Sequence, residues 1–138
     1  MTGCLLDTNI VLIALADADR LTRAVRSAVL RGPNVVSVVA FWEVTLKASR
    51  GKLDVGDPRV WWETALGDLA ATSLPLRAEH VAELQNVPIL HNDPFDRVLI
   101  AQAACEDLAL VTTDAKLPRY ASARVRVMRL RRAPAPSA

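Results

Sequence analysis

Apolar and polar positions along the chain alternate between short apolar runs and longer stretches with helical spacing. The short runs predict strands at residues 3–6, 34–38, 72–76, 109–113 and 124–130. The intervening segments predict helices at residues 10–16, 21–30, 39–50, 57–69, 78–85 and 98–105. Strands that alternate with helices are typical of an α/β fold with a mostly parallel sheet, here of four to five strands, covered on both faces.

Length and composition fit one domain. The chain has 138 residues, of which 51% are hydrophobic, and this is enough to bury a core without disulfides or a structural metal. Residues 1–132 are expected to form a single domain, and residues 133–138, which alternate Pro with small residues, a disordered tail. Cys4 and Cys105 are expected to be reduced thiols.

Charge and hydropathy favour a protein that works in the cytoplasm. The sequence has neither a long apolar run nor a basic N-terminal region of the signal-peptide kind, so no membrane contact is expected. The net charge of +2 is too small to indicate nucleic-acid binding by itself. The arginines that crowd residues 124–132 are interpreted first as a solvated surface.

The segment from His91 to Arg97 precedes the long apolar helix and carries a clear helix-start signal. Asp93 stands at the N-cap position, Pro94 at the first helical position, and Asp96 three residues after the cap. An acid at that position can complement the helix dipole for about 0.5–1 kcal/mol. The same position also suits a functional carboxylate at the edge of a crevice, and the segment alone does not decide between the two roles.

Four acids, each at the end of a predicted strand or in the first turns of the helix that follows it, form a candidate site. They are Asp7, Glu43, Asp96 and Asp114. In parallel α/β sheets the functional crevice lies beyond the carboxyl ends of the strands. Carboxylates about 5 Å apart repel by roughly 3 kcal/mol at an effective dielectric constant near 20, so the site requires a cation. Oxygen ligands without His or Cys favour Mg²⁺ or Mn²⁺, which can activate water against a phosphodiester. For Glu43, an ion pair with Lys47 is the alternative.

The sequence resembles the PIN-domain family, and more narrowly the VapC-type toxins of bacterial type II toxin–antitoxin pairs. The segments that carry the resemblance are Asp7-Thr8-Asn9, Trp42-Glu43 with Gly51-Lys52-Leu53, His91 to Arg97, and Thr112-Thr113-Asp114. It extends over nearly the whole chain, and Asp93-Pro94-Phe95-Asp96-Arg97 is its most specific part. The chain departs from the family at Val39-Ala40-Phe41, where members carry small polar residues.

The resemblance implies a three-layer α/β/α fold and a Mg²⁺-dependent RNA endonuclease, with Mn²⁺ as a plausible substitute. It assigns Asp7, Glu43, Asp96 and Asp114 as catalytic acids, the three aspartates among them as metal ligands, and Asn9 and Thr112 as supporting residues. Asp93 is interpreted as a cap rather than a ligand. The expected partners are an RNA substrate, a cognate antitoxin and a second copy of the chain.

Other classes compete with this interpretation. A PIN nuclease for RNA maturation would carry the same four acids, and a non-catalytic acidic pocket would only bind a basic partner segment. A phosphatase of the haloacid-dehalogenase type requires a second Asp two residues after the first, where this chain has Asn9. A receiver module requires a phospho-accepting Asp on a middle strand, and nothing after Ser37 supplies one.

Overall fold

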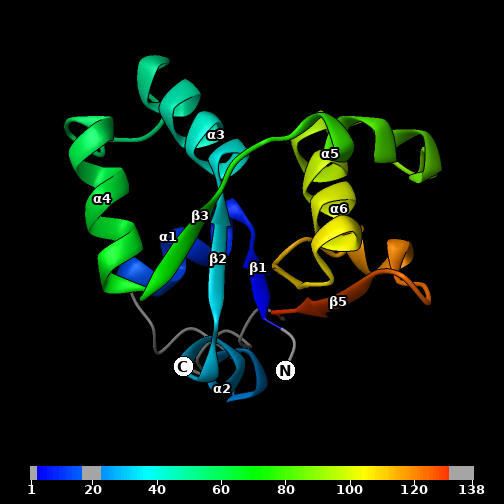
Figure 1. Cartoon of the computed structure of the whole chain (residues 1–138). Coiled ribbons are helices and arrows are strands. Elements are labelled where there is room, and N and C mark those ends of the chain that lie inside the picture. The colour runs from blue at the N-terminus through cyan, green and yellow to red at the C-terminus, as the bar shows by residue number, and fades with distance from the viewer. Residues whose placement is uncertain (1–2, 17–22, 131–138) are drawn as a thin grey trace, which may run out of the picture.

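The computed structural model describes residues 3–16 and 23–130, and it contains one five-stranded sheet with helices on both faces (Figure 1). The elements are β1 (Cys4–Leu6), α1 (Thr8–Ala16), α2 (Arg23–Arg31), β2 (Asn34–Ser37), α3 (Val38–Ser49), α4 (Pro58–Asp68), β3 (Ala71–Leu74), α5 (Ala78–Glu83), the 3₁₀ helix η2 (Leu84–Asn86), α6 (Pro94–Glu106), β4 (Ala109–Thr112), the 3₁₀ helix η3 (Leu117–Tyr120) and β5 (Arg126–Arg129). The predicted tail at residues 133–138 and the predicted helix start at residues 21 and 22 lie outside the described residues.

The sheet has the strand order β3-β2-β1-β4-β5, and every pair of neighbours is parallel. The α/β class and the parallel sheet are therefore confirmed. β1 pairs with β4, and Leu6 lies opposite Val111. The chain leaves β1 toward β2 on one side and returns to β4 on the other, so the strand order reverses between β1 and β4. A crevice is expected beyond the carboxyl ends of these two strands.

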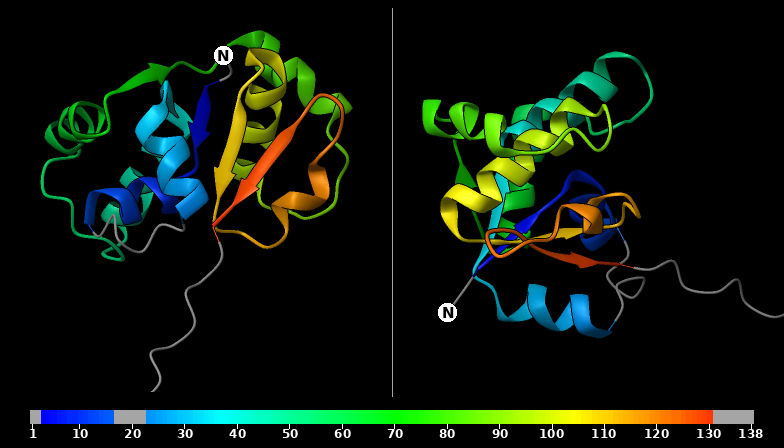
Figure 2. Two further views of the ribbon diagram at one scale, coloured as in Figure 1. Left: turned by 90° about the horizontal axis from the view of Figure 1, so that it is seen from below. Right: turned by 90° about the vertical axis from the view of Figure 1, so that its right-hand side faces the viewer.

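The two faces of the sheet are covered by different helices, as the predicted three-layer fold requires. Successive side chains of a strand point to opposite faces. Leu5 and Leu110 pack in one core cluster with buried residues of α6, whereas Leu6 and Val111 pack in a second cluster with α1 and α2. Figure 2 shows α2 and α6 on opposite sides of the sheet.

Local sequence signals set most of the helix boundaries. Asp57 is the N-cap of α4, with Pro58 following it, and α3 is followed by Gly51 with a φ of 71°, as the sequence predicts. β3 ends at Leu74, two residues before the predicted end, because Pro75 has no backbone N–H for the ladder. The helix predicted at residues 78–85 divides into α5 and η2.

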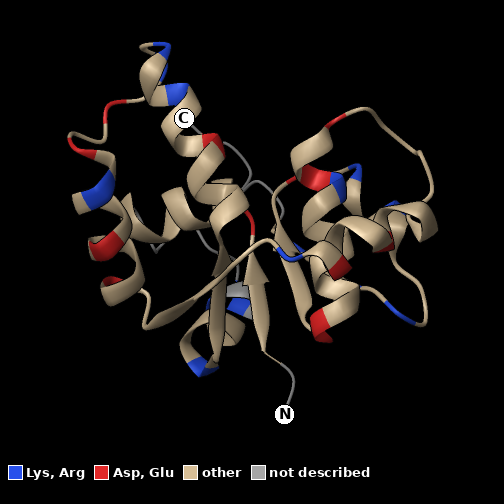
Figure 3. Ribbon diagram, turned by 45° about the horizontal axis from the view of Figure 1, so that its top comes forward, with Lys and Arg blue, Asp and Glu red and all other residues tan. Residues whose placement is uncertain are grey.

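Charged positions are distributed over helices on both sides of the sheet rather than separated into one basic and one acidic half (Figure 3). This distribution agrees with the interpretation of most arginines as solvated surface. Both cysteines are free. None of the helices in the described part of the chain is long and apolar enough to cross a membrane.

Candidate active site

Asp7 directly follows β1 at the carboxyl edge of the sheet, and only 5% of its surface is exposed. Its backbone N–H donates to the carbonyl oxygen of Val111 at 3.0 Å, which extends the ladder between β1 and β4. Its side chain accepts at Oδ1 from the backbone N–H of Ile10 at 2.9 Å and at Oδ2 from the hydroxyl of Thr112. Two elements of the fold therefore hold this carboxylate in one orientation.

Thr112, the last residue of β4, links two of the predicted acids. Its hydroxyl donates to Asp7 and accepts from the backbone N–H of Asp114 at 3.0 Å. Asp114 in turn accepts at Oδ1 from the backbone N–H of Lys116 at 2.8 Å. One hydroxyl group thus fixes Asp7 and Asp114 relative to each other, which is a direct physical basis for the supporting role expected of Thr112.

Asp96 lies in the first turn of α6, and the predicted cap of this helix is present. Oδ1 of the N-cap residue Asp93 accepts from the backbone N–H of Phe95 at 2.9 Å and from that of Asp96 at 3.2 Å. Because Asp93 satisfies the amides at the helix start, the side chain of Asp96 is not needed as a cap. Its Oδ2 instead lies 3.1 Å from Nε2 of His91.

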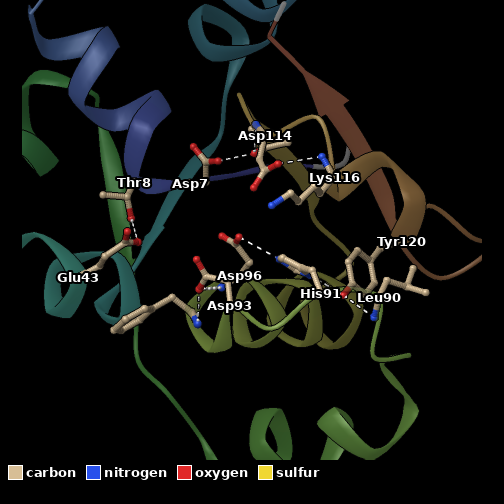
Figure 4. Close-up of polar contacts among 12 residues, drawn as sticks. Asp7, Thr8, Glu43, Leu90, His91, Asp93, Asp96, Asp114, Lys116 and Tyr120 are labelled. Carbon is tan, nitrogen blue, oxygen red and sulfur yellow. Dashed lines mark hydrogen bonds and ion pairs between the residues drawn. The ribbon is translucent and has the colours of Figure 1, made fainter.

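The structure brings three of the four predicted acids together. Asp7, Asp96 and Asp114, here called the acidic site, come from the end of β1, the start of α6 and the loop after β4 (Figure 4). One oxygen of Asp96, one oxygen of Asp114 and one ring nitrogen of His91 lie within 4.8 Å of one another. Asp7 lies near enough to Asp96 for the charge of Asp96 to raise its pKa.

Burial raises the pKa of Asp7 from its ordinary value of 3.8 to about 6, and burial does the same for the pKa of Asp96. Neighbouring negative charges add to both rises: that of Asp96 at Asp7, and those of Asp93 and Asp114 at Asp96. In the part of the chain that the structure describes, no Lys or Arg forms an ion pair with the acidic site. Among the described residues, His91 is therefore the only basic side chain that pairs with an acid of the site, through Asp96.

The donor atoms of the acidic site fit a hard divalent cation. Asp7, Asp96 and Asp114 offer carboxylate oxygens, which Mg²⁺ and Mn²⁺ prefer as ligands. A cation bound there would offset the repulsion between the carboxylates, which adds to the effect of burial on the pKa values of Asp7 and Asp96. The three residues predicted as metal ligands are thus the three that converge.

Glu43, the fourth predicted acid, lies apart from the other three, on α3 (Figure 4). Its Oε1 accepts from the hydroxyl of Thr8 at 2.8 Å, and its Oε2 forms an ion pair with Nζ of Lys47 at 3.0 Å. The ion pair is the structural alternative considered for Glu43 from the sequence. The bond to Thr8, the residue after Asp7, nevertheless ties this carboxylate to the border of the acidic site.

The contacts of Asn9 and His91 add detail that the sequence pattern does not reveal. The side-chain amide of Asn9 donates to the hydroxyl of Thr113 at 3.4 Å, so it supports the loop after β4 rather than Asp7 directly. His91, which begins the segment that carries the family resemblance, contacts both Asp96 and Tyr120. The sequence pattern includes His91 in the segment before the helix but gives no signal for Tyr120.

A second group of His and acidic residues lies between α5 and α6. Glu79, His80 and Glu106 also have ligand atoms within 4.8 Å of one another. Nδ1 of His80 accepts from the backbone N–H of Arg77 at 3.0 Å, so the proton of the neutral ring lies on Nε2, which donates to Glu106 at 2.9 Å. Arg77 also pairs with Glu106 at 3.3 Å. Arg77, His80 and Glu106, here called the α5–α6 cluster, satisfy one another, which gives His80 a structural role.

The family profile of the PIN domain matches residues 4–123. The chain therefore belongs to the PIN domain family, and the family predicted from its motifs is confirmed. PIN domains are generally nucleases, so the broad enzyme class is supported as well. No functionally curated protein matches the chain in sequence.

Solved structures with the same fold include toxin–antitoxin complexes. VapBC2 from Rickettsia felis, bound to a DNA fragment from its promoter, gives a TM-score of 0.71 at 16% identity, over 92% of this chain and 98% of that chain. FitAcB from Neisseria gonorrhoeae gives a TM-score of 0.63 at 21% identity, over 90% of this chain and 95% of that chain. VapBC-5 from Mycobacterium tuberculosis is a member of the VapBC family of toxin–antitoxin systems. It gives a TM-score of 0.61 at 19% identity, over 93% of this chain and 99% of that chain. At these identities the likeness establishes the fold.

Proposed function

We propose that this chain is a Mg²⁺-dependent RNA endonuclease, with Mn²⁺ as a substitute ion, that acts in the cytoplasm as the toxin of a type II toxin–antitoxin pair. The observation that carries the proposal is the acidic site, in which burial raises the pKa of two of three convergent carboxylates to about 6. Membership of the PIN family and the fold shared with VapBC complexes support the same function.

Each acid has a distinct role in this proposal. Asp7, Asp96 and Asp114 are the metal ligands. When bound, the ion supplies an activated water and positive charge for hydrolysis of a phosphodiester bond. Glu43 is assigned as the fourth catalytic acid, since its bond to Thr8 holds its carboxylate at the border of the acidic site. Thr112 and Asn9 are supporting residues: Thr112 donates to Asp7, and Asn9 donates to Thr113 in the loop after β4.

The proposed partners follow from the family and from the shared fold. VapBC-5 is a member of the VapBC family of toxin–antitoxin systems, and VapBC2 shares the fold of this chain, which supports a cognate antitoxin for it. RNA as the substrate and a homodimer as the assembly are parts of the same proposal.

Cleavage by the purified protein, freed of any partner, tests the enzymatic part. RNA should be cut with Mg²⁺ or Mn²⁺, the reaction should stop with EDTA, and DNA of the same sequence should remain intact. Asp96→Asn should lower the cleavage rate by more than about 100-fold, because loss of even an outer-shell partner of a metal ligand costs 10–100-fold.

Asp54→Asn is the matched control for this experiment. Asp54 is exposed, and within the described residues its side chain accepts only from the backbone N–H of Gly56, which an asparagine can also do. This variant should cleave RNA like the wild type. Undiminished cleavage by Asp96→Asn, in a preparation free of contaminating nuclease, would rule out the acidic site as the centre of the reaction.

Expression in bacteria tests the toxin part separately. The wild type should arrest growth, Asp7→Ala should not, and co-expression of the small gene adjacent to this one should restore growth. A protein that cleaves RNA in vitro but is harmless at matched expression is a maturation nuclease. A protein that neither cleaves RNA nor arrests growth is a binding module.

A further inference from the structure

A chain of hydrogen bonds ends on Asp96 and begins outside the acidic site (Figure 4). The backbone N–H of Leu90 donates to the phenol oxygen of Tyr120 at 3.1 Å, and that oxygen lies 2.7 Å from Nδ1 of His91. Nε2 of His91 lies 3.1 Å from Oδ2 of Asp96. Tyr120 is 5% exposed and the side chain of His91 is 10% exposed, so water competes little for these bonds.

The groups on either side of His91 favour one arrangement of its ring protons. A backbone N–H can only donate, so the oxygen of Tyr120 accepts from Leu90 and keeps its own proton for donation. When His91 is neutral, the arrangement in which Tyr120 donates to Nδ1 places the ring proton on Nε2, facing Asp96. The other tautomer would set a nitrogen lone pair against the carboxylate of Asp96 and is therefore disfavoured. When His91 is charged, both ring nitrogens carry protons. In either state an N–H at Nε2 faces Asp96, and its nitrogen lone pair is not available to a cation.

The same chain links the two loops that carry the acids. Tyr120 ends η3, which begins three residues after Asp114, whereas His91 precedes the cap of α6. The bond between Tyr120 and His91 therefore joins the segment that carries Asp114 to the segment that carries Asp96. It also anchors Oδ2 of Asp96, while no hydrogen bond to Oδ1 of Asp96 is found within the described residues.

From these contacts we infer that Tyr120 and His91 are positioning residues, which hold the carboxylate of Asp96 toward Asp7 and Asp114 for binding of a divalent cation. The inference rests on the proposed function, since it concerns the metal site of that reaction. His91 is assigned as a residue that orients a ligand rather than as a ligand. Groups that orient metal ligands in this way contribute about 10–100-fold to metal affinity or activity.

Binding of Mn²⁺ to the metal-free protein, measured by isothermal titration calorimetry, tests the inference without relying on activity. His91→Leu removes the donor and should weaken Mn²⁺ binding by about 10–100-fold. Tyr120→Phe removes one buried oxygen but keeps the ring, and it should weaken binding by a smaller factor. His91→Gln should restore most of the affinity, because its amide nitrogen lies as many bonds from Cβ as Nε2 does.

Cleavage kinetics provide the second measurement. His91→Leu should lower kcat when Mn²⁺ is limiting, and kcat should recover as the Mn²⁺ concentration is raised. KM for RNA should stay within about two-fold of the wild type. The matched control is His80→Leu, which alters the other buried histidine and should leave the affinity for Mn²⁺ unchanged. Circular dichroism identifies the temperature at which each variant is folded.

The outcomes separate the two proposals. Wild-type affinity in both His91→Leu and Tyr120→Phe would overturn the positioning role while leaving the proposed function intact. If His91→Gln binds as poorly as His91→Leu while Tyr120→Phe binds like the wild type, His91 is itself a ligand and the inference is wrong. A wild-type protein that neither binds Mn²⁺ nor cleaves RNA overturns both proposals.

Discussion

The acidic site and the α5–α6 cluster contain similar side chains in opposite electrostatic situations. Each places a buried histidine beside a carboxylate of α6, at 3.1 Å for His91 and Asp96 and at 2.9 Å for His80 and Glu106. In the α5–α6 cluster Arg77 neutralises Glu106, whereas no described Lys or Arg pairs with Asp96. Proximity of histidine and acids is therefore not what distinguishes a metal site. The two clusters differ in that Arg77 pairs with the carboxylate of one, whereas no described Lys or Arg pairs with the carboxylates of the other.

The largest effect on stability is expected in the α5–α6 cluster. His80→Leu should lower the free energy of unfolding by about 3 kcal/mol, because it leaves the backbone N–H of Arg77 and the carboxylate of Glu106 without a buried partner. Urea denaturation at pH 7 measures this loss. A loss below about 1 kcal/mol would contradict the view that the cluster is a structural network.

The acidic site should make the metal-free protein less stable as the pH rises. The folded pKa of Asp7 is about 6 and its ordinary pKa is 3.8, so the folded state binds this proton more tightly than the unfolded state does. Its contribution to stability is greatest below pH 4 and is lost as the pH rises through 6. Between pH 4 and pH 7.5 the wild type should lose about 2 kcal/mol more than Asp7→Asn, in urea denaturation with EDTA. Equal losses in the two proteins would show that the pKa of Asp7 is not raised.

Neutralising Asp7 should stabilise the metal-free protein at neutral pH while weakening its response to metal. Asp7→Asn removes one charge and keeps an acceptor for the backbone N–H of Ile10. The free energy of unfolding at pH 7.5 should therefore rise by about 1 kcal/mol, which corresponds to an increase in Tm of about 4 °C. The Tm increase on adding Mg²⁺ should shrink, because the ion stabilises only through the folded site. Thermal melts of both proteins with EDTA and with excess Mg²⁺ provide the test. A destabilised Asp7→Asn with an unchanged Mg²⁺ gain would mean that Asp7 serves only the structure.

The smallest effect is expected at Glu106. Glu106→Gln keeps the acceptor for His80 and loses only the ion pair with Arg77, whose side chain is 50% exposed. The free energy of unfolding should therefore change by about 0.5 kcal/mol or less. The Tm increase with Mg²⁺ should equal that of the wild type. A smaller Mg²⁺ gain would show that the α5–α6 cluster also binds the ion.

The convergence of Asp7 and Asp114 could be predicted from the sequence because it depends on periodic features. Apolar runs indicate strands, parallel strands place their carboxyl ends at one edge of a sheet, and both residues follow such runs. The start of α6 could also be predicted, because Asp93 and Pro94 form a local helix-capping signal. These parts of the site follow from residues that lie close together in the chain or from the pairing of two strands.

The contacts of Tyr120, Thr8 and Glu43 could not be predicted in the same way. Tyr120 contacts His91, 29 residues away in the chain. Tyr120 lies in a 3₁₀ helix that the spacing of apolar residues does not predict. Thr8 meets Glu43 across 35 residues because α1 packs on α3, and helix packing leaves no local signal for a particular hydroxyl. The pair of Glu43 with Lys47 was predictable because it lies within one helix.

The cap of α6 has a consequence for motion. One oxygen of Asp93 accepts from the amides of both Phe95 and Asp96, so these two amide protons exchange with solvent when the cap bonds break or when the first turn of the helix opens. Opening of that turn would also carry the side chain of Asp96 away from the sheet edge. The exchange rates of the two amides therefore set an upper limit on how often the turn that carries Asp96 opens.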